Sequence, residues 1–175
     1  MSGFYPASGV DSSQISPSDA AVTLRSLSRR FASAVATPDD DDRPEDAIRR
    51  RPGNGGLSAI EHTAWVAAAL PGLLLALHRI VVESDPTIEV PPLDPTPPIE
   101  GADRSAADIV ADIATETGRL ADAIDAVSGD DWLRAGRLGG ESVTALDVAR
   151  SAVQLSIYHL RSAVRTLSEV VHEAR

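Results

Sequence analysis

The sequence predicts an all-α fold, a single four-helix bundle with long crossover connections. Three observations support it. Four long segments place apolar side chains at steps of three and four residues. No segment shows the sustained alternation of apolar and polar residues that marks a strand. Two connections between the segments are long, which fits a bundle with crossovers better than an up-down arrangement. The chain of 175 residues is long enough to bury a core, so we expect residues 1–175 to form one domain.

The first two helices are predicted from their amino-terminal signals. We expect the first at about residues 17–36, with Ser16 as its N-cap. The second is expected at about residues 58–83, where Ser58 and Glu61 form the Ser-x-x-Glu pattern of a capping box. This second helix is apolar on nearly every side. It must therefore be covered by the rest of the bundle or by a second subunit.

The other two helices are amphipathic and follow a proline-rich connection. Residues 105–127 carry apolar side chains on one face and acidic ones on the other, and residues 144–174 form the clearest apolar seam. The linker at residues 84–101 holds six prolines, so we expect it to be extended and stiff. It is long enough to run the length of the bundle and to start the third helix at the far end.

The composition excludes several kinds of chemistry. The chain carries 26 acidic residues and a net charge of -10, which argues against binding to nucleic acid. It has no cysteine, so disulfides, cysteine nucleophiles and zinc–thiolate sites are excluded. All 16 basic residues are arginine, which excludes mechanisms that need a lysine, such as Schiff-base formation. Arginine and alanine codons are GC-rich, so this composition indicates a GC-rich genome.

The sequence also predicts where the protein resides. Its amino terminus lacks the charged region and apolar run of a signal peptide. The longest apolar stretch, residues 64–77, is shorter than the ~20 residues that span a bilayer. We therefore expect a soluble, cytoplasmic protein without a membrane partner.

Two of the four histidines are candidates for a functional site. His62 and His159 lie in the middle of apolar helical segments, whereas we interpret His78 as a packed or capping residue and His172 as exposed. Histidines on two helices can share a metal ion, but a stable site usually needs at least three protein ligands. No His-x-x-x-His or Glu-x-x-His pair lies within one helix.

Three segments resemble the DinB-like superfamily, which includes mycothiol-dependent maleylpyruvate isomerases and bacillithiol and mycothiol S-transferases. Residues 57–66, Leu-Ser-Ala-Ile-Glu-His-Thr-Ala-Trp-Val, are similar to the family's helix-two signature, Trp-Ser-x-x-Glu-x-x-x-His-aliphatic. Residues 144–161 resemble its last helix, and residues 15–20 and 24–27 resemble the first helix of actinobacterial members. The resemblance implies a four-helix bundle that is often dimeric.

The resemblance also implies a changed metal site. In the family, three side chains, commonly histidines, hold a divalent metal that activates a thiol. The matching positions here are occupied by Trp65, Gln154 and Tyr158. An indole has no lone pair to give, an amide is a weak ligand, and a phenol of ordinary pKa is mostly protonated. His159 matches the neighbour of the second ligand. We expect the three replaced positions to meet in a cleft that holds no metal.

These observations lead to one main hypothesis and two others. The main one is a homodimeric, metal-free, non-catalytic DinB-like protein without a cofactor, which binds a small molecule or a protein partner. The alternative is a thiol S-transferase or isomerase that uses mycothiol and a divalent metal such as zinc or nickel. Its relocated site would be built from His62 and His159, with Glu61 as the nearest third ligand. In the third reading, the apolar second helix forms the interface with a partner.

Overall fold

The structure is a computed structural model that describes residues 4–35 and 46–173. Four helices form most of it, which confirms the predicted fold class, and all four lie close to the predicted ranges. They are α1 (Pro17–Val35), α2 (Ala59–Val82), α3 (Ala106–Ala126) and α4 (Ala145–Glu173). Short 3-10 helices lie at Pro6–Ser8, Ala47–Arg49 and Gly129–Leu133.

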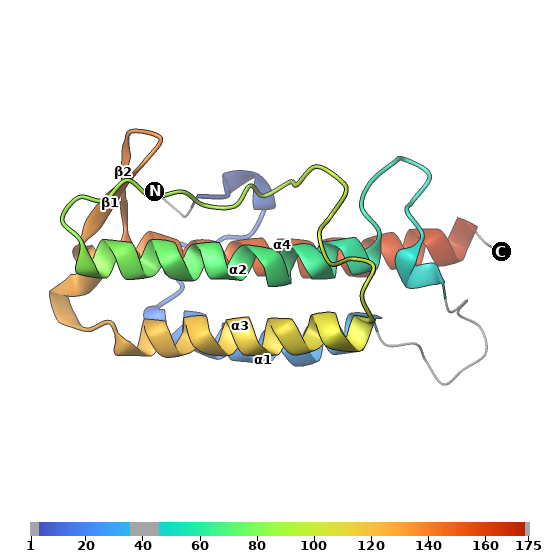
Figure 1. Cartoon of the computed structure of the whole chain (residues 1–175), viewed down its shortest axis with the longest axis horizontal. Coiled ribbons are helices and arrows are strands. Elements are labelled where there is room, and N and C mark those ends of the chain that lie inside the picture. The colour runs from blue at the N-terminus through green and yellow to red at the C-terminus, as the bar shows by residue number, and fades with distance from the viewer. Residues whose placement is uncertain (1–3, 36–45, 174–175) are drawn as a thin grey trace.

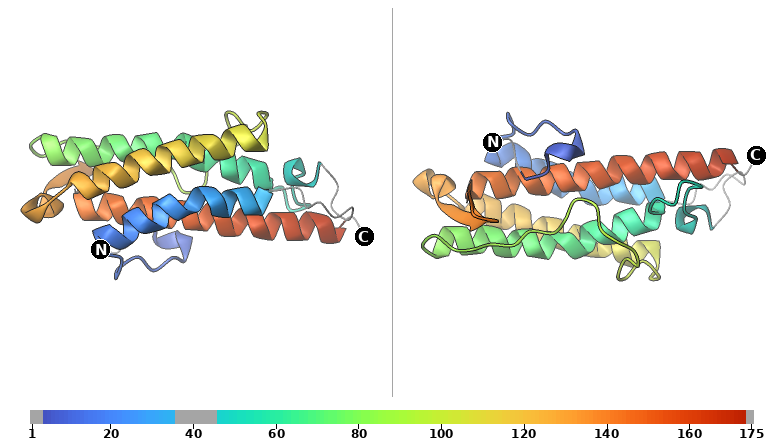
Figure 2. Two further views of the ribbon diagram at one scale, coloured as in Figure 1. Left: turned by 90° about the horizontal axis from the view of Figure 1, so that it is seen from below. Right: turned by 90° about the horizontal axis from the view of Figure 1, so that it is seen from above.

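The four helices pack in two parallel pairs. Helices α1 and α4 run in one direction along the bundle, and α2 and α3 run in the other (Figures 1 and 2). Helix α1 packs against α3 and α4, and α2 packs against the same two helices, so α1 and α2 lie on a diagonal. Because α2 and α3 are parallel neighbours, the chain must return along the whole bundle between them.

The proline-rich strap, residues 84–101, makes this return and confirms the predicted crossover (Figure 1). Its first part is fixed near the end of α2, where the Ile88 N–H donates to the carbonyl of Arg137 at 2.8 Å. Further along, the buried Tyr5 hydroxyl donates to the carbonyl of Pro91 at 2.5 Å. Ile88 and Ile99 are buried, so the strap belongs to the folded core and is more than a tether.

A small β-hairpin differs from the prediction that the chain contains no strand. Strands β1 (Ala135–Leu138) and β2 (Glu141–Thr144) pair antiparallel just before α4. Gly139 and Gly140 form the turn with φ angles of 58° and 89°, values that glycine adopts without steric penalty. The strands are only four residues each, too short to show an alternating pattern, but a Gly-Gly pair is itself a hairpin signal.

The predicted helix caps are present. The Ser16 hydroxyl accepts the Asp19 N–H at 3.2 Å at the start of α1. At the start of α2, the Ser58 hydroxyl accepts the Glu61 N–H at 3.3 Å and the Glu61 carboxylate accepts the Ser58 N–H at 2.8 Å. These reciprocal bonds satisfy amide groups that have no partner within the helix, and each cap contributes about 1 kcal/mol.

Helix α2 provides much of the core. It is the one helix of the described residues that is long and apolar enough to cross a membrane by length and composition alone. Helix α2 has 24 residues and extends beyond the apolar stretch of residues 64–77, from which no membrane span was predicted. The same composition is typical of a core helix, and α2 packs against both α3 and α4. Leu75 and Val82, on its outer side, are 59% and 63% exposed.

Candidate functional site

The two candidate histidines meet inside the bundle. His62 lies in the second turn of α2 and His159 lies midway along α4, and the packing of these helices brings the two rings together. Their Nδ1 atoms are 2.9 Å apart, which is a hydrogen-bond distance. The ring centroids are 5.2 Å apart. His159 is fully buried, and His62 is partly exposed.

A backbone carbonyl decides which ring nitrogens carry protons. His159 Nε2 lies 2.8 Å from the carbonyl oxygen of Leu93 in the strap. A carbonyl only accepts, so Nε2 must carry the hydrogen, and Nδ1 of a neutral His159 is then an acceptor. It follows that His62 donates from its own Nδ1. His62 Nε2 then carries no hydrogen and has a lone pair that can accept a hydrogen bond. No hydrogen-bond partner for this atom is found among the described residues.

Both histidines are neutral at pH 7. Burial lowers the pKa of His62 to about 4, with further contributions from the nearby His159 and Arg165. Burial also lowers the pKa of His159 to about 4, and the Leu93 carbonyl opposes this shift only in part. The hydrogen bond between the two Nδ1 atoms needs one donor and one acceptor, which two neutral rings provide. Two protonated rings would place a donor against a donor.

A cavity of about 450 Å³ opens beside His62. Its walls come from the loop at residues 52–57, the strap and α4. The Tyr158 hydroxyl donates to Asp94 Oδ1 at 2.8 Å, and its ring stands edge-on to His159 with centroids 5.1 Å apart. Burial and the adjacent Asp94 raise the pKa of Tyr158. The cavity therefore combines an imidazole acceptor, a carboxylate, a phenol and the Arg165 guanidinium.

Glu61 is held away from a role as metal ligand. Arg51 donates to both of its carboxylate oxygens, from Nε at 2.9 Å and from Nη2, and Ser58 donates from its backbone. Partial burial acts to raise the pKa of Glu61, but these hydrogen bonds outweigh it and leave the pKa lowered. The carboxylate is thus a charged, fully engaged cap of α2.

The three replaced positions make different contacts. Of the three, only Tyr158 lines the cavity. Gln154 is buried and donates from Nε2 to the carbonyl of Val10 at 3.0 Å, which ties the amino-terminal segment to α4. Trp65 packs against both apolar clusters of the core, and its buried Nε1 has no hydrogen-bond partner among the described residues.

The side chains around His62 do not fit a divalent metal centre of the expected type. The two Nδ1 atoms are engaged with each other, and His159 Nε2 carries a hydrogen. Glu61 is engaged by Arg51, and no group of three His, Asp or Glu side chains suited to a metal occurs within residues 4–35 and 46–173. A stable site usually needs three such ligands.

Sequence reasoning did not find three participants in this site. The carbonyl of Leu93 belongs to the backbone, so no side-chain pattern marks it. Asp94 stands alone between prolines of the strap, and Arg165 is one of many arginines. Asp94 is one of four acidic residues of the strap, with Asp85, Glu89 and Glu100, so no local signal distinguishes it.

The fold and the site together define a four-helix bundle with a hydrogen-bonded histidine pair between α2 and α4. Its structure is similar to that of YfiT from Bacillus subtilis, described as a probable metal-dependent hydrolase with an unusual four-helix bundle topology. The TM-score is 0.72 over 95% of this chain and 92% of that chain, at 13% sequence identity. A likeness at this identity shows the fold alone. No protein-family model matches the chain, and no curated protein matches it.

Proposed function

We propose that this protein binds a small polar molecule, without a metal ion, in the cavity beside His62. One observation carries the proposal: the Leu93 carbonyl fixes the tautomers of both histidines and leaves the lone pair of His62 Nε2 as an acceptor. The ligand would donate a hydrogen bond to this atom. A fixed, neutral acceptor needs no reorganisation on binding, which favours recognition of a neutral donor group.

The other walls of the cavity limit the ligand further. Arg165 offers a guanidinium fork, which suits a carbonyl, carboxylate or phosphate oxygen. Asp94 and Tyr158 form a hydrogen-bonded pair that can accept a second donor. The volume of about 450 Å³ lies within the range of ordinary small-molecule sites. These groups together suit a small ligand with donors on one side and an acceptor on the other.

Binding without catalysis is tested first by metal analysis. Protein purified after supplementation with zinc and nickel should contain neither metal at a near-equimolar level. Near-equimolar metal that is lost in His62→Ala or His159→Ala would contradict the proposal and favour the alternative, a metal- and mycothiol-dependent transferase or isomerase. Turnover of an electrophile by a thiol that stops on chelation would do the same.

Ligand binding is tested by screening a library of small polar fragments by NMR. We expect hits that shift the ring signals of His62 and that weaken about tenfold in His62→Phe, which removes the acceptor. The exposed His78→Phe is the matched control and should bind the same hits unchanged. Hits that bind both variants equally, or a library without any hit at this cavity, would count against the site.

The proposal includes a homodimer formed through the outer side of α2. Leu75 and Val82 are one heptad apart on this side and are both more than half exposed, so a second copy could cover both together. Light scattering coupled to size exclusion should give twice the chain mass. Leu75→Glu should give a monomer, whereas the exposed Leu133→Glu, outside α2, should not change the mass.

A further inference from the structure

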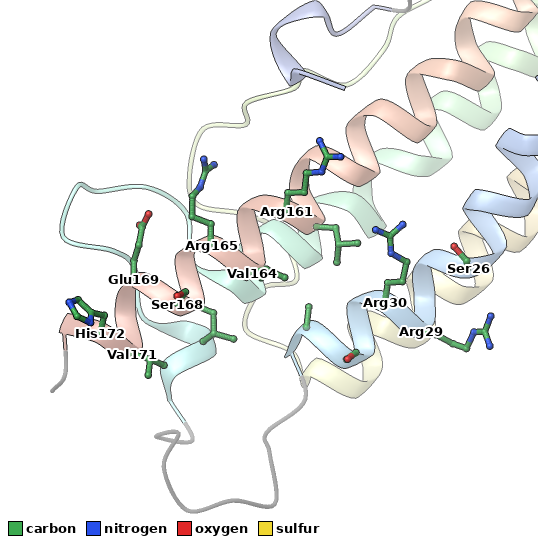
Figure 3. A pocket seen from close by; sticks show the side chains of 14 residues that line it. Ser26, Arg29, Arg30, Arg161, Val164, Arg165, Ser168, Glu169, Val171 and His172 are labelled. Carbon is green, nitrogen blue, oxygen red and sulfur yellow. The ribbon is translucent and has the colours of Figure 1, made fainter. Parts of the chain in front are cut away.

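A second, larger cavity lies in a groove between α1 and α4. It has a volume of about 1320 Å³ and lies toward the carboxyl-terminal ends of these two parallel helices (Figure 3). Leu160 and Leu167 are buried in its lining, and Val164 is 52% exposed there. This groove is separate from the cavity beside His62, although Arg165 lines both.

Four arginines line the groove without a carboxylate partner: Arg29 and Arg30 from α1, and Arg161 and Arg165 from α4. In the part of the chain that the structure describes, no ion pair or backbone carbonyl engages them, and Arg165 alone reaches a side-chain oxygen, that of Ser162 at 3.3 Å. The other described arginines all donate to a carboxylate or a carbonyl. Those paired with carboxylates are Arg25, Arg50, Arg51, Arg79, Arg104, Arg119 and Arg137, and those bonded to carbonyls are Arg49, Arg134 and Arg150.

This arrangement is unusual in a chain with 26 acidic residues and a net charge of -10. Acidic side chains are abundant enough to pair with every arginine, yet Glu169 is the carboxylate in the lining, and no ion pair joins it to the four within the described residues. Like charges gathered in one groove repel one another. An anion placed among them removes the repulsion and adds charge-assisted hydrogen bonds.

The charged and apolar groups are separated along the groove. Figure 3 shows Arg30 and Arg161 on facing helices at one end, with Val164 and then Val171 further toward the end of α4. Ten residues separate Arg161 from Val171, which corresponds to about 15 Å of helix. An elongated ligand with a charged head and an aliphatic body matches this order.

We propose that the groove binds an amphipathic organic anion, with a carboxylate or phosphate head between Arg30 and Arg161 and an aliphatic body along Val164 and Val171. A guanidinium fork recognises either head by paired hydrogen bonds. A second copy of this chain, docked by two-fold symmetry on the same face, would bring the two sets of arginines together. Charge therefore favours the small anion over self-association at this groove.

The test uses dodecanoate and dodecyl phosphate below their micellar concentrations, titrated calorimetrically into the full chain. We expect saturable binding of one molecule per chain for at least one of the two, and the better binder identifies the head. Arg30→Gln and Arg161→Gln should each weaken binding by about tenfold, which corresponds to about 1.4 kcal/mol. Arg119→Gln removes the same charge from the exposed surface of α3 and should leave the affinity unchanged.

Further arms separate the head from the body. Inorganic phosphate should bind at least about tenfold more weakly than dodecyl phosphate, and Val164→Asp should weaken both amphiphiles by charge repulsion and loss of apolar contact. The proposal is wrong if neither amphiphile binds, if both arginine variants bind as tightly as the native chain, or if neutral dodecyl maltoside binds equally well. Saturable binding of an acidic helical peptide in place of the amphiphiles would identify a protein partner and would also overturn it. Circular dichroism of each variant shows that loss of binding is not loss of fold.

Discussion

Acidification from pH 7.5 to pH 5.0 is expected to destabilise the folded chain through its histidine pair. In the unfolded chain each histidine has its ordinary pKa of about 6.5, and burial lowers the folded pKa of His62 and of His159 to about 4. Between these values the unfolded state binds more protons, so the free energy of unfolding falls as the pH falls. The loss at pH 5.0 is about 2 kcal/mol per histidine, or about 4 kcal/mol for both.

Urea denaturation followed by circular dichroism at pH 7.5, 6.0 and 5.0 measures this loss. A loss of about 4 kcal/mol is a large part of the 5–15 kcal/mol that holds a typical domain folded. The double variant His62→Gln with His159→Gln keeps amide donors and acceptors but cannot titrate. It should lose most of the pH dependence whatever its stability at pH 7.5. The exposed His78→Gln is the matched control and should keep the native dependence.

Two results would refute the reasoning. A native free energy of unfolding that is equal at pH 7.5 and pH 5.0 would mean that the histidines titrate alike in the folded and unfolded states. A double variant with the native pH dependence would mean that other groups carry it.

Three further predictions concern the supports of the site. Glu61→Ala removes the capping box and the ion pair with Arg51 and should lower the free energy of unfolding by about 2 kcal/mol. Glu83→Ala removes an exposed ion pair at the other end of α2 and should lower the free energy of unfolding by less than about 1 kcal/mol. Chemical denaturation compares the two variants. Tyr158→Phe removes a hydrogen bond to the strap and should speed cleavage of the strap in limited proteolysis, and an unchanged rate would contradict this role. Gly136→Ala places a Cβ 2.8 Å from the Pro86 carbonyl and should destabilise the fold by about 1–3 kcal/mol. Gly118→Ala lies in open space on α3 and should stabilise the fold by about 0.5–1 kcal/mol. Thermal melts that rank the two variants in the reverse order would show that the strap is loosely held.

The helices were predictable because their signals are local. The caps at Ser16 and Ser58 are read within four residues, and the apolar periodicity of each helix needs no knowledge of its neighbours. The hairpin at residues 135–144 was missed because its strands have only four residues each, too few for an alternating pattern. The pairing of α1 with α3 and α4 depends on the packing of the whole chain, and no local signal specifies it.

The site was predictable only in part, for a different reason. The sequence singled out His62 and His159 because each lies in the middle of an apolar helical segment, and the structure brings them together. It also offered Glu61 as a third ligand, although the capping box already engaged that carboxylate. The decisive partner, the carbonyl of Leu93, is a group that every residue possesses. Only the path of the strap determines which carbonyl reaches the ring.

The diagonal placement of α1 and α2 also has a kinetic consequence. In an up-down bundle, consecutive helices pack as local hairpins, but here every main helix interface closes a long loop of chain. The hydrogen bond between the histidines itself joins residues 97 positions apart. Proteins dominated by such non-local contacts fold more slowly than helical bundles of low contact order. This chain should therefore fold slowly for an all-helical protein, and its histidine pair should assemble only once the strap and all four helices have met.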